Sequence, residues 1–192
     1  MALNATIYKA ALQITDMDRH YYQDHALTIA RHPSETDERM MVRVLAFARH
    51  ASDTLTFGKG RLGAPGESHQ QPEPDLWQKD LTGAIDLWIE VGQPDERSVR
   101  QACGRARQVV IYTYGGHKAN RWWEQNRAGF ERAKNLTVIS LPVETTHALA
   151  NLAKRGMQLH CTIQDGQIML GDGNETVEVA MTTLKSVQAV VR

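Results

Sequence analysis

The sequence predicts an α/β fold in which a mixed sheet is flanked by helices, with further β-strands added at the N- and C-terminal ends. Between residues 84 and 141, β-branched runs alternate with single amphipathic helices, which indicates right-handed crossovers and parallel strands. The first thirty residues and those after residue 156 instead form strand-like runs separated by turn residues, which is typical of hairpins. No internal repeat interrupts this order.

The composition is that of a globular protein, with 192 residues, 42% hydrophobic and 23% charged. Lys+Arg and Asp+Glu balance at 22 each, so nucleic-acid binding would need a local basic patch. The cysteines, Cys103 and Cys161, form no Cys-x-x-Cys pair, which argues against a thiolate zinc site or a disulfide scaffold. No signal-like start or run of ~20 apolar residues is present. We therefore expect a cytoplasmic protein without a membrane partner.

The N-terminal third predicts a hairpin and a helix. Strand-like runs at residues 3–14 and 21–30 flank a turn at residues 16–19. Apolar residues then recur at helical spacing, which predicts an amphipathic helix over residues 35–50. Ser34 stands before its acidic first turn and is expected to be the N-cap. Its hydroxyl has a second possible role in binding phosphate or substrate, but the cap is favoured.

The middle and C-terminal parts complete the α/β pattern. A short strand is expected at residues 55–57, and the four glycines and three prolines of residues 58–74 predict an exposed loop. Strands are then predicted at residues 84–91, 108–114 and 136–141, with helices from Pro94 and around residues 119–130 between them. A helix at residues 144–154 and strands at residues 157–163, 167–170 and 176–181 close the chain, with turns at Asp165-Gly166 and residues 172–174.

The strand at residues 84–91 carries two acids on one face. Alternate residues of a strand share a face, so Asp86, Trp88 and Glu90 point to one side and the aliphatic residues between them to the other. A central parallel strand is usually apolar on both faces. Two interpretations stay equally open at this point: ordinary surface carboxylates, or an acidic cleft that binds a divalent metal.

The runs His32-Pro33-Ser34-Glu35-Thr36, Glu38-Arg39-Met40-Met41 and GAIDLWIEVGQPDER resemble the YaeQ family of bacterial proteins. The similarity extends from MALNATIYKA to QDGQIML, so it implies a single YaeQ-like domain over residues 1–192. It also implies a PD-(D/E)XK nuclease-like core of a helix, three strands, a helix and a strand, with Mg²⁺ held between carboxylates. The family has no firmly assigned activity, so the resemblance implies a fold and a site more than a reaction.

The resemblance assigns motif positions to three acids of this chain. Glu90 matches the Glu of the Glu-x-Lys motif, Glu38 matches the acid of the first core helix, and Asp86 is the chosen partner carboxylate. Asp86 and Glu90 are therefore the expected metal ligands. Gly92 stands where the motif has lysine, which puts catalysis in doubt. Lys118 is the nearest replacement by chain order, and Arg100 on the preceding helix is the other candidate.

Strand geometry adds a constraint to this assignment. At ~3.3 Å per residue the Cα atoms of Asp86 and Glu90 lie about 13 Å apart, whereas oxygens that share one Mg²⁺ lie within about 4 Å. Either a bulge brings the two acids together, or Glu90 pairs with Glu38 or with a carboxylate of the loop. Asp75, in the Pro74-Asp75 dipeptide, is such a carboxylate and is weighted below Asp86.

These observations predict a Mg²⁺-dependent nuclease or phosphodiesterase with a degenerate motif. The alternative is a non-catalytic module on the same fold that binds nucleic acid or protein. Arg100 is the expected substrate contact on the helix after the acidic strand, although that basic face can equally be a solvated surface paired with Glu96. Nucleic acid is thus a possible partner, and the sequence leaves the oligomeric state open.

Overall fold

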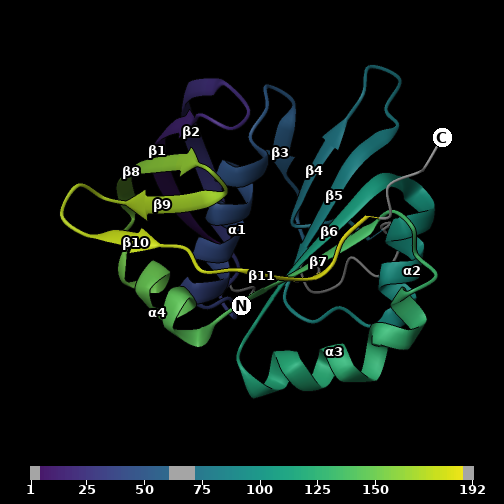
Figure 1. The fold of residues 1–192 in the computed structure, drawn as a ribbon. Helices are drawn as coiled ribbons and strands as arrows, with labels where there is room; N and C mark the ends of the chain where they lie inside the picture. Colours follow the sequence, from purple (N-terminus) through teal and green to yellow (C-terminus); the bar gives the residue numbers. More distant parts are fainter. Residues whose placement is uncertain (1–4, 61–71, 188–192) are drawn as a thin grey trace. The chain divides into compact units, whose positions relative to one another are not determined.

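The computed structural model describes residues 5–60 and 72–187, which fall into two compact units. One unit contains residues 5–51 and 144–180, and the other contains residues 52–60, 72–143 and 181–187. Each unit has a sheet of its own, of five and six strands (Figure 1). The α/β class with a mixed sheet and helices is confirmed, but the expectation of one sheet is wrong, because the added terminal strands pair mainly with one another.

The first unit is built on a five-stranded sheet in the order β10-β9-β8-β1-β2. Its strands are β1 (Thr6–Asp16), β2 (Tyr21–Arg31), β8 (Gly156–Gln164), β9 (Gln167–Gly171) and β10 (Thr176–Glu178). The predicted N-terminal hairpin is confirmed, since β1 and β2 pair antiparallel over their whole length. The predicted β8–β9 hairpin is also confirmed, while β1 and β8 run parallel, which makes the sheet mixed.

Two helices belong to the first unit, α1 (Asp37–His50) and α4 (Val143–Asn151). The rings of Phe47 on α1 and His25 on β2 pack in a T-shaped arrangement, with their centroids 5.1 Å apart. The predicted N-cap Ser34 is wrong, because Thr36 caps α1 by accepting a hydrogen bond from the Arg39 N–H at 3.1 Å. Ser34 lies in a turn before the helix, where its hydroxyl bonds His32 Nδ1 at 2.7 Å.

The second unit contains a six-stranded sheet in the order β11-β7-β6-β5-β4-β3. Its strands are β3 (Leu55–Phe57), β4 (Leu76–Lys79), β5 (Ile85–Val91), β6 (Ala106–Tyr114), β7 (Leu136–Leu141) and β11 (Thr182–Lys185). The predicted parallel pairing holds for β5, β6 and β7, while β3, β4 and β5 form an antiparallel meander. Strand β4 was not predicted, because it has only four residues and a turn follows it directly.

Helices α2 (Glu96–Arg105) and α3 (His117–Phe130) share one core with strands β5, β6 and β7. Trp88 of β5 and Phe130 of α3 are both buried in this core, and Trp122 donates its indole N–H to the Pro94 carbonyl at 2.7 Å. Because alternate residues share a face, the side of β5 that carries Trp88 and Glu90 is the side covered by these helices. The strand order also places β5 between β6 and β4, so its acids are not on an edge strand.

Most of the predicted loop at residues 58–74 lies outside the described residues, and its described ends belong to no helix or strand. Within residues 5–60 and 72–187, no helix combines the length and the apolar character needed to cross a membrane.

The last residue of α1, His50, predicts a pH dependence of stability. Burial lowers the pKa of His50 to about 3, and the charges of Arg49 and Arg19 add to the effect. The unfolded side chain titrates near 6.5, so below that pH the unfolded state binds more protons than the folded state. We expect the free energy of unfolding to fall as the pH drops from 6.5 toward 3, with a slope of up to about 1.4 kcal/mol per pH unit.

Urea denaturation of the His50→Gln variant between pH 6.5 and 5 measures this contribution, with His117→Gln at the exposed start of α3 as the matched control. The slope becomes shallower in the first variant and stays unchanged in the second. Equal slopes in wild type and His50→Gln would contradict the assignment.

Candidate functional site

Glu90 is a buried carboxylate near the end of β5. Its side chain is held by Trp88, whose indole N–H donates to Glu90 Oε1 at 3.0 Å, and only 5% of Glu90 is exposed. Trp88 is in turn covered by the guanidinium of Arg105, 5.0 Å from the ring centroid. The surface-carboxylate interpretation is therefore wrong for Glu90, which sits where an acid needs a specific structural or chemical reason.

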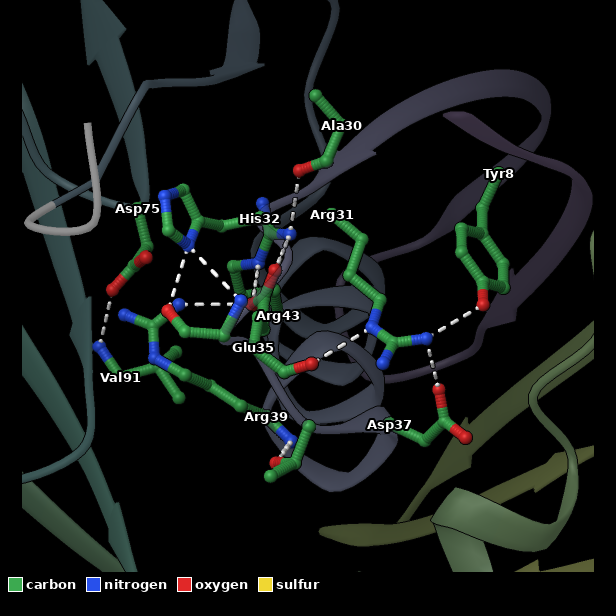
Figure 2. Close-up of polar contacts among 12 residues, drawn as sticks. Tyr8, Ala30, Arg31, His32, Glu35, Asp37, Arg39, Arg43, Asp75 and Val91 are labelled. Carbon is green, nitrogen blue, oxygen red and sulfur yellow. Dashed lines mark hydrogen bonds and ion pairs between the residues drawn. The ribbon is translucent and has the colours of Figure 1, made fainter. Parts of the chain in front are cut away.

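Asp75 lies directly before β4 and is brought to the part of β5 that carries Glu90. Its backbone N–H donates to the Ile89 carbonyl at 3.0 Å, and its Oδ2 accepts a hydrogen bond from the Val91 N–H at 2.7 Å (Figure 2). The two bonds therefore join Asp75 to the residues on either side of Glu90. Asp75 is 1% exposed, so both acids are withdrawn from bulk solvent.

A glycine segment holds Asp75 from its other side. The Gly58 N–H donates to the Asp75 carbonyl at 2.9 Å, and the Gly60 N–H donates to the Pro74 carbonyl at 3.0 Å. A Cβ atom at Gly60 would lie 2.6 Å from Asp75 Oδ1, and Gly60 has a φ of +64°. A side chain at this position would displace the carboxylate, so glycine is required for the close approach.

Asp86 lies at the other end of the same strand and has other partners. Its Oδ1 is 2.9 Å from a guanidinium nitrogen of Arg107, which also reaches Asp80 at 3.3 Å. The β4–β5 register shifts opposite Asp86, between Gln78 and Lys79, so a bulge is present. The carboxylate is nevertheless directed to Arg107, and the structure does not bring Asp86 and Glu90 onto a common partner.

The glycine in the lysine position of the motif has a backbone conformation that excludes lysine. Gly92 follows the end of β5 with a φ of +113°, and its N–H donates to the Tyr112 carbonyl at 2.8 Å. L-residues rarely adopt this φ. The missing lysine is therefore not a simple side-chain loss, because the chain leaves the strand geometry at this residue.

The predicted basic residues lie on the surface of the second unit. Lys118 is exposed in the first turn of α3, and its backbone N–H donates to the Gly115 carbonyl at 3.2 Å. Arg100 is exposed on α2 and pairs with Glu96 at 2.6 Å. Arg100 thus has the partner expected for a solvated helix face.

In the first unit, Glu38 contacts α4. Its Oε2 accepts a hydrogen bond from Thr146 Oγ1 at 3.0 Å, and its Oε1 lies 3.5 Å from His147 Nε2. These contacts connect α1 with α4 within the first unit.

Glu35 is a buried acid of the first unit, and it was not singled out from the sequence. Arg43 binds it through two guanidinium nitrogens, at 2.8 and 2.7 Å, and Arg39 adds a third contact at 2.9 Å (Figure 2). Arg43 also donates to the Ala30 carbonyl at 3.0 Å. The spacing of one acid followed by arginines four and eight residues later was the available signal.

The described residues contain no group of three or more His, Cys, Asp or Glu side chains placed to hold a metal ion. The donor type of the Asp75–Glu90 pair nevertheless suits Mg²⁺, which binds oxygen ligands and commonly uses only one or two protein carboxylates with water and substrate phosphate. Asp75 and Glu90 are therefore the residues that fit the ion implied by the family resemblance.

The comparisons with known proteins all find the same family. The family model described as YaeQ protein matches residues 1–181. The chain is 43% identical over 182 residues to "Uncharacterized protein YaeQ" of Escherichia coli (strain K12) and to that of Salmonella typhi, covering 95% of this chain and 97% of each relative. The crystal structure of YaeQ protein from Xanthomonas axonopodis pv. citri has a TM-score of 0.86 at 46% identity, covering 95% of this chain and 99% of that one. The Pseudomonas syringae structure has a TM-score of 0.86 at 33% identity, covering 95% and 97%.

The conformation of Gly92 leads to a stability prediction. We expect Gly92→Ala to lower the free energy of unfolding by about 1–3 kcal/mol, because alanine is strained at this φ. Gly104→Ala is the matched control, since Gly104 lies within α2 and a Cβ atom added there would meet no neighbouring atom within 4 Å. The control is expected to raise stability by roughly 0.5–1 kcal/mol. Urea titration measures both, and equal effects would argue against a strained position at Gly92.

Proposed function

The chain belongs to the YaeQ family, and on that premise we propose that it is a Mg²⁺-dependent phosphodiesterase of the nuclease type with Asp75 and Glu90 as its carboxylate pair. The observation that carries the proposal is the pair of hydrogen bonds that joins Asp75 to the residues on either side of Glu90. This pairing replaces the Asp86–Glu90 pair expected from the strand pattern.

The order of elements supports the proposal. Helix α1, strands β3, β4 and β5, helix α2 and strand β6 follow one another along the chain, which is the helix, three strands, helix and strand order of the PD-(D/E)XK core. Pro74-Asp75 precedes β4, and Glu90 lies near the end of the antiparallel neighbour β5. The two acidic parts of the motif therefore occur on adjacent strands at the same end.

The protein's own residues orient the two carboxylates. The Val91 N–H holds the Asp75 carboxylate, and the Trp88 indole holds that of Glu90. A bound Mg²⁺ would polarise a phosphate oxygen and help to activate a water molecule as the nucleophile. Lys118 is the candidate basic group, because the parallel strands β5 and β6 end at the same edge and Lys118 lies at the start of the helix that follows β6.

A second candidate function is a non-catalytic module on the same fold that binds nucleic acid or protein. Two observations favour it: both acids are at least nine-tenths buried, and Gly92 has a conformation that excludes the motif lysine. A structural role for the acids would then explain their hydrogen bonds without any reaction.

Cleavage assays on single- and double-stranded DNA and RNA in millimolar Mg²⁺ or Mn²⁺ test the leading proposal. We expect cleavage that EDTA abolishes and that falls at least about 100-fold in Asp75→Asn and in Glu90→Gln, because each isosteric change removes a ligand charge. Asp86→Asn retains cleavage if Asp75 is the partner of Glu90. Loss in Asp86→Asn with retention in Asp75→Asn would reverse the pairing.

Calorimetric titration of the wild type with Mg²⁺ separates the two functions. Absence of both cleavage and metal binding, together with retained nucleic-acid or protein binding, would exclude the enzyme and support the module. Denaturation curves of each variant show whether a loss comes from misfolding.

A further inference from the structure

The five-stranded sheet of the first unit has one face turned toward its helices and one exposed face. The exposed face consists of the odd-numbered residues of β1 from Ile7 to Thr15, and the even-numbered residues of β2 from Tyr22 to Ala30 and of β8 from Gln158 to Thr162. We call this surface the outer face. Lys9 and Asp24 are its charged residues, two of thirteen positions, which is a smaller share than the 23% of the whole chain. Exposed surfaces are ordinarily richer in charge than the chain average.

Small side chains form the centre of the outer face. Ala11 of β1 pairs with Ala26 of β2 in the antiparallel register. Lys9 lies one exposed position to one side of this pair on β1, and Asp24 lies one exposed position to the other side on β2. The Ala11–Ala26 pair is therefore the midpoint between a cation and an anion, which lie about 14 Å apart at ordinary strand spacings.

This arrangement is complementary to itself. The two copies can be related by a twofold axis that lies in the plane of the interface. The axis passes between Ala11 and Ala26 and is perpendicular to the line from Lys9 to Asp24. It places each Lys9 opposite the Asp24 of the second copy. The alanines then face one another at the axis, where the sheets approach most closely. On regular spacings the strands of the two sheets cross at roughly 40°, near the ~30° of aligned sheet packings.

A hollow beside Asp24 can accommodate Lys9 of the second copy. Its volume is about 440 Å³, and Gln13, Thr15, Tyr22 and Asp24 are among the residues that line it. A lysine side chain lying along Tyr22 would bury its apolar stem and bring its ammonium to the Asp24 carboxylate. Tyr22 is 58% exposed, so it has apolar surface available for that contact.

We propose that the outer face binds a second copy of this chain through face-to-face packing of the two sheets, with reciprocal Lys9–Asp24 ion pairs. The size of the surface agrees with this occupant. The strands that carry the outer face, β2, β1 and β8, together cover roughly 500 Å² in projection. Accessible area exceeds projected area, so the surface approaches the ~800 Å² per partner of a standard interface.

Sedimentation velocity of the full-length chain over a range of concentrations tests the proposal by charge reversal. The wild type is expected to dimerise, and Lys9→Glu or Asp24→Lys alone should raise the Kd at least about tenfold, because each places like charges opposite one another twice. The Lys9→Glu/Asp24→Lys double variant restores opposite charges at both contacts and should return the Kd to within about threefold of wild type.

Lys134→Glu, a reversal at an exposed residue between α3 and β7 of the second unit, is the matched control and should leave the Kd unchanged. Circular dichroism melts confirm that each variant is folded. A wild type that stays monomeric at every concentration would exclude the second copy as the occupant. A dimer that both single reversals leave intact, or that the double variant fails to restore, would place the interface elsewhere.

Discussion

The hydrogen bond from the Val91 N–H to the Asp75 carboxylate is the interaction on which the candidate site depends. It ties the residue that precedes β4 to the end of β5, and it does so beside Glu90. The opposite side of Asp75 is held by Gly58 and Gly60, where a Cβ atom at Gly60 would collide with the carboxylate. A charged group with 1% exposure is tolerated only when such partners replace its water.

The same contacts explain why the site supports two functions. Hydrogen-bonded, oriented carboxylates are suitable ligands for a hard cation, because their geometry is set before the ion binds. They also remove exposed charge from the surface, which is what a purely structural acid does. The conformation of Gly92 favours the non-catalytic module, whereas the arrangement of Asp75 and Glu90 favours the metal-dependent enzyme. The proposed dimer surface belongs to the other unit, so it is compatible with either function.

Much of the fold could be predicted from local patterns. The α/β alternation of residues 84–141 and the N-terminal hairpin depend on periodicity and turn residues that each segment carries itself. The N-cap was misplaced because Ser34 and Thr36 are both good caps, and the choice depends on the turn that His32 makes with Ser34. Strand β4 was missed because its four residues are too few for a clear period.

The sequence by itself determined the fold class, the face of β5 that carries Glu90 and the absence of the motif lysine at position 92. Only the tertiary structure decided that Asp75 lies beside Glu90 while Asp86 pairs with Arg107. The reason is that strand pairing and register are long-range properties: residues 75 and 90 meet because β4 and β5 are antiparallel neighbours. A glycine-rich segment that the sequence predicts as an exposed loop supplies, at Gly58 and Gly60, the close contacts that hold the acid in place.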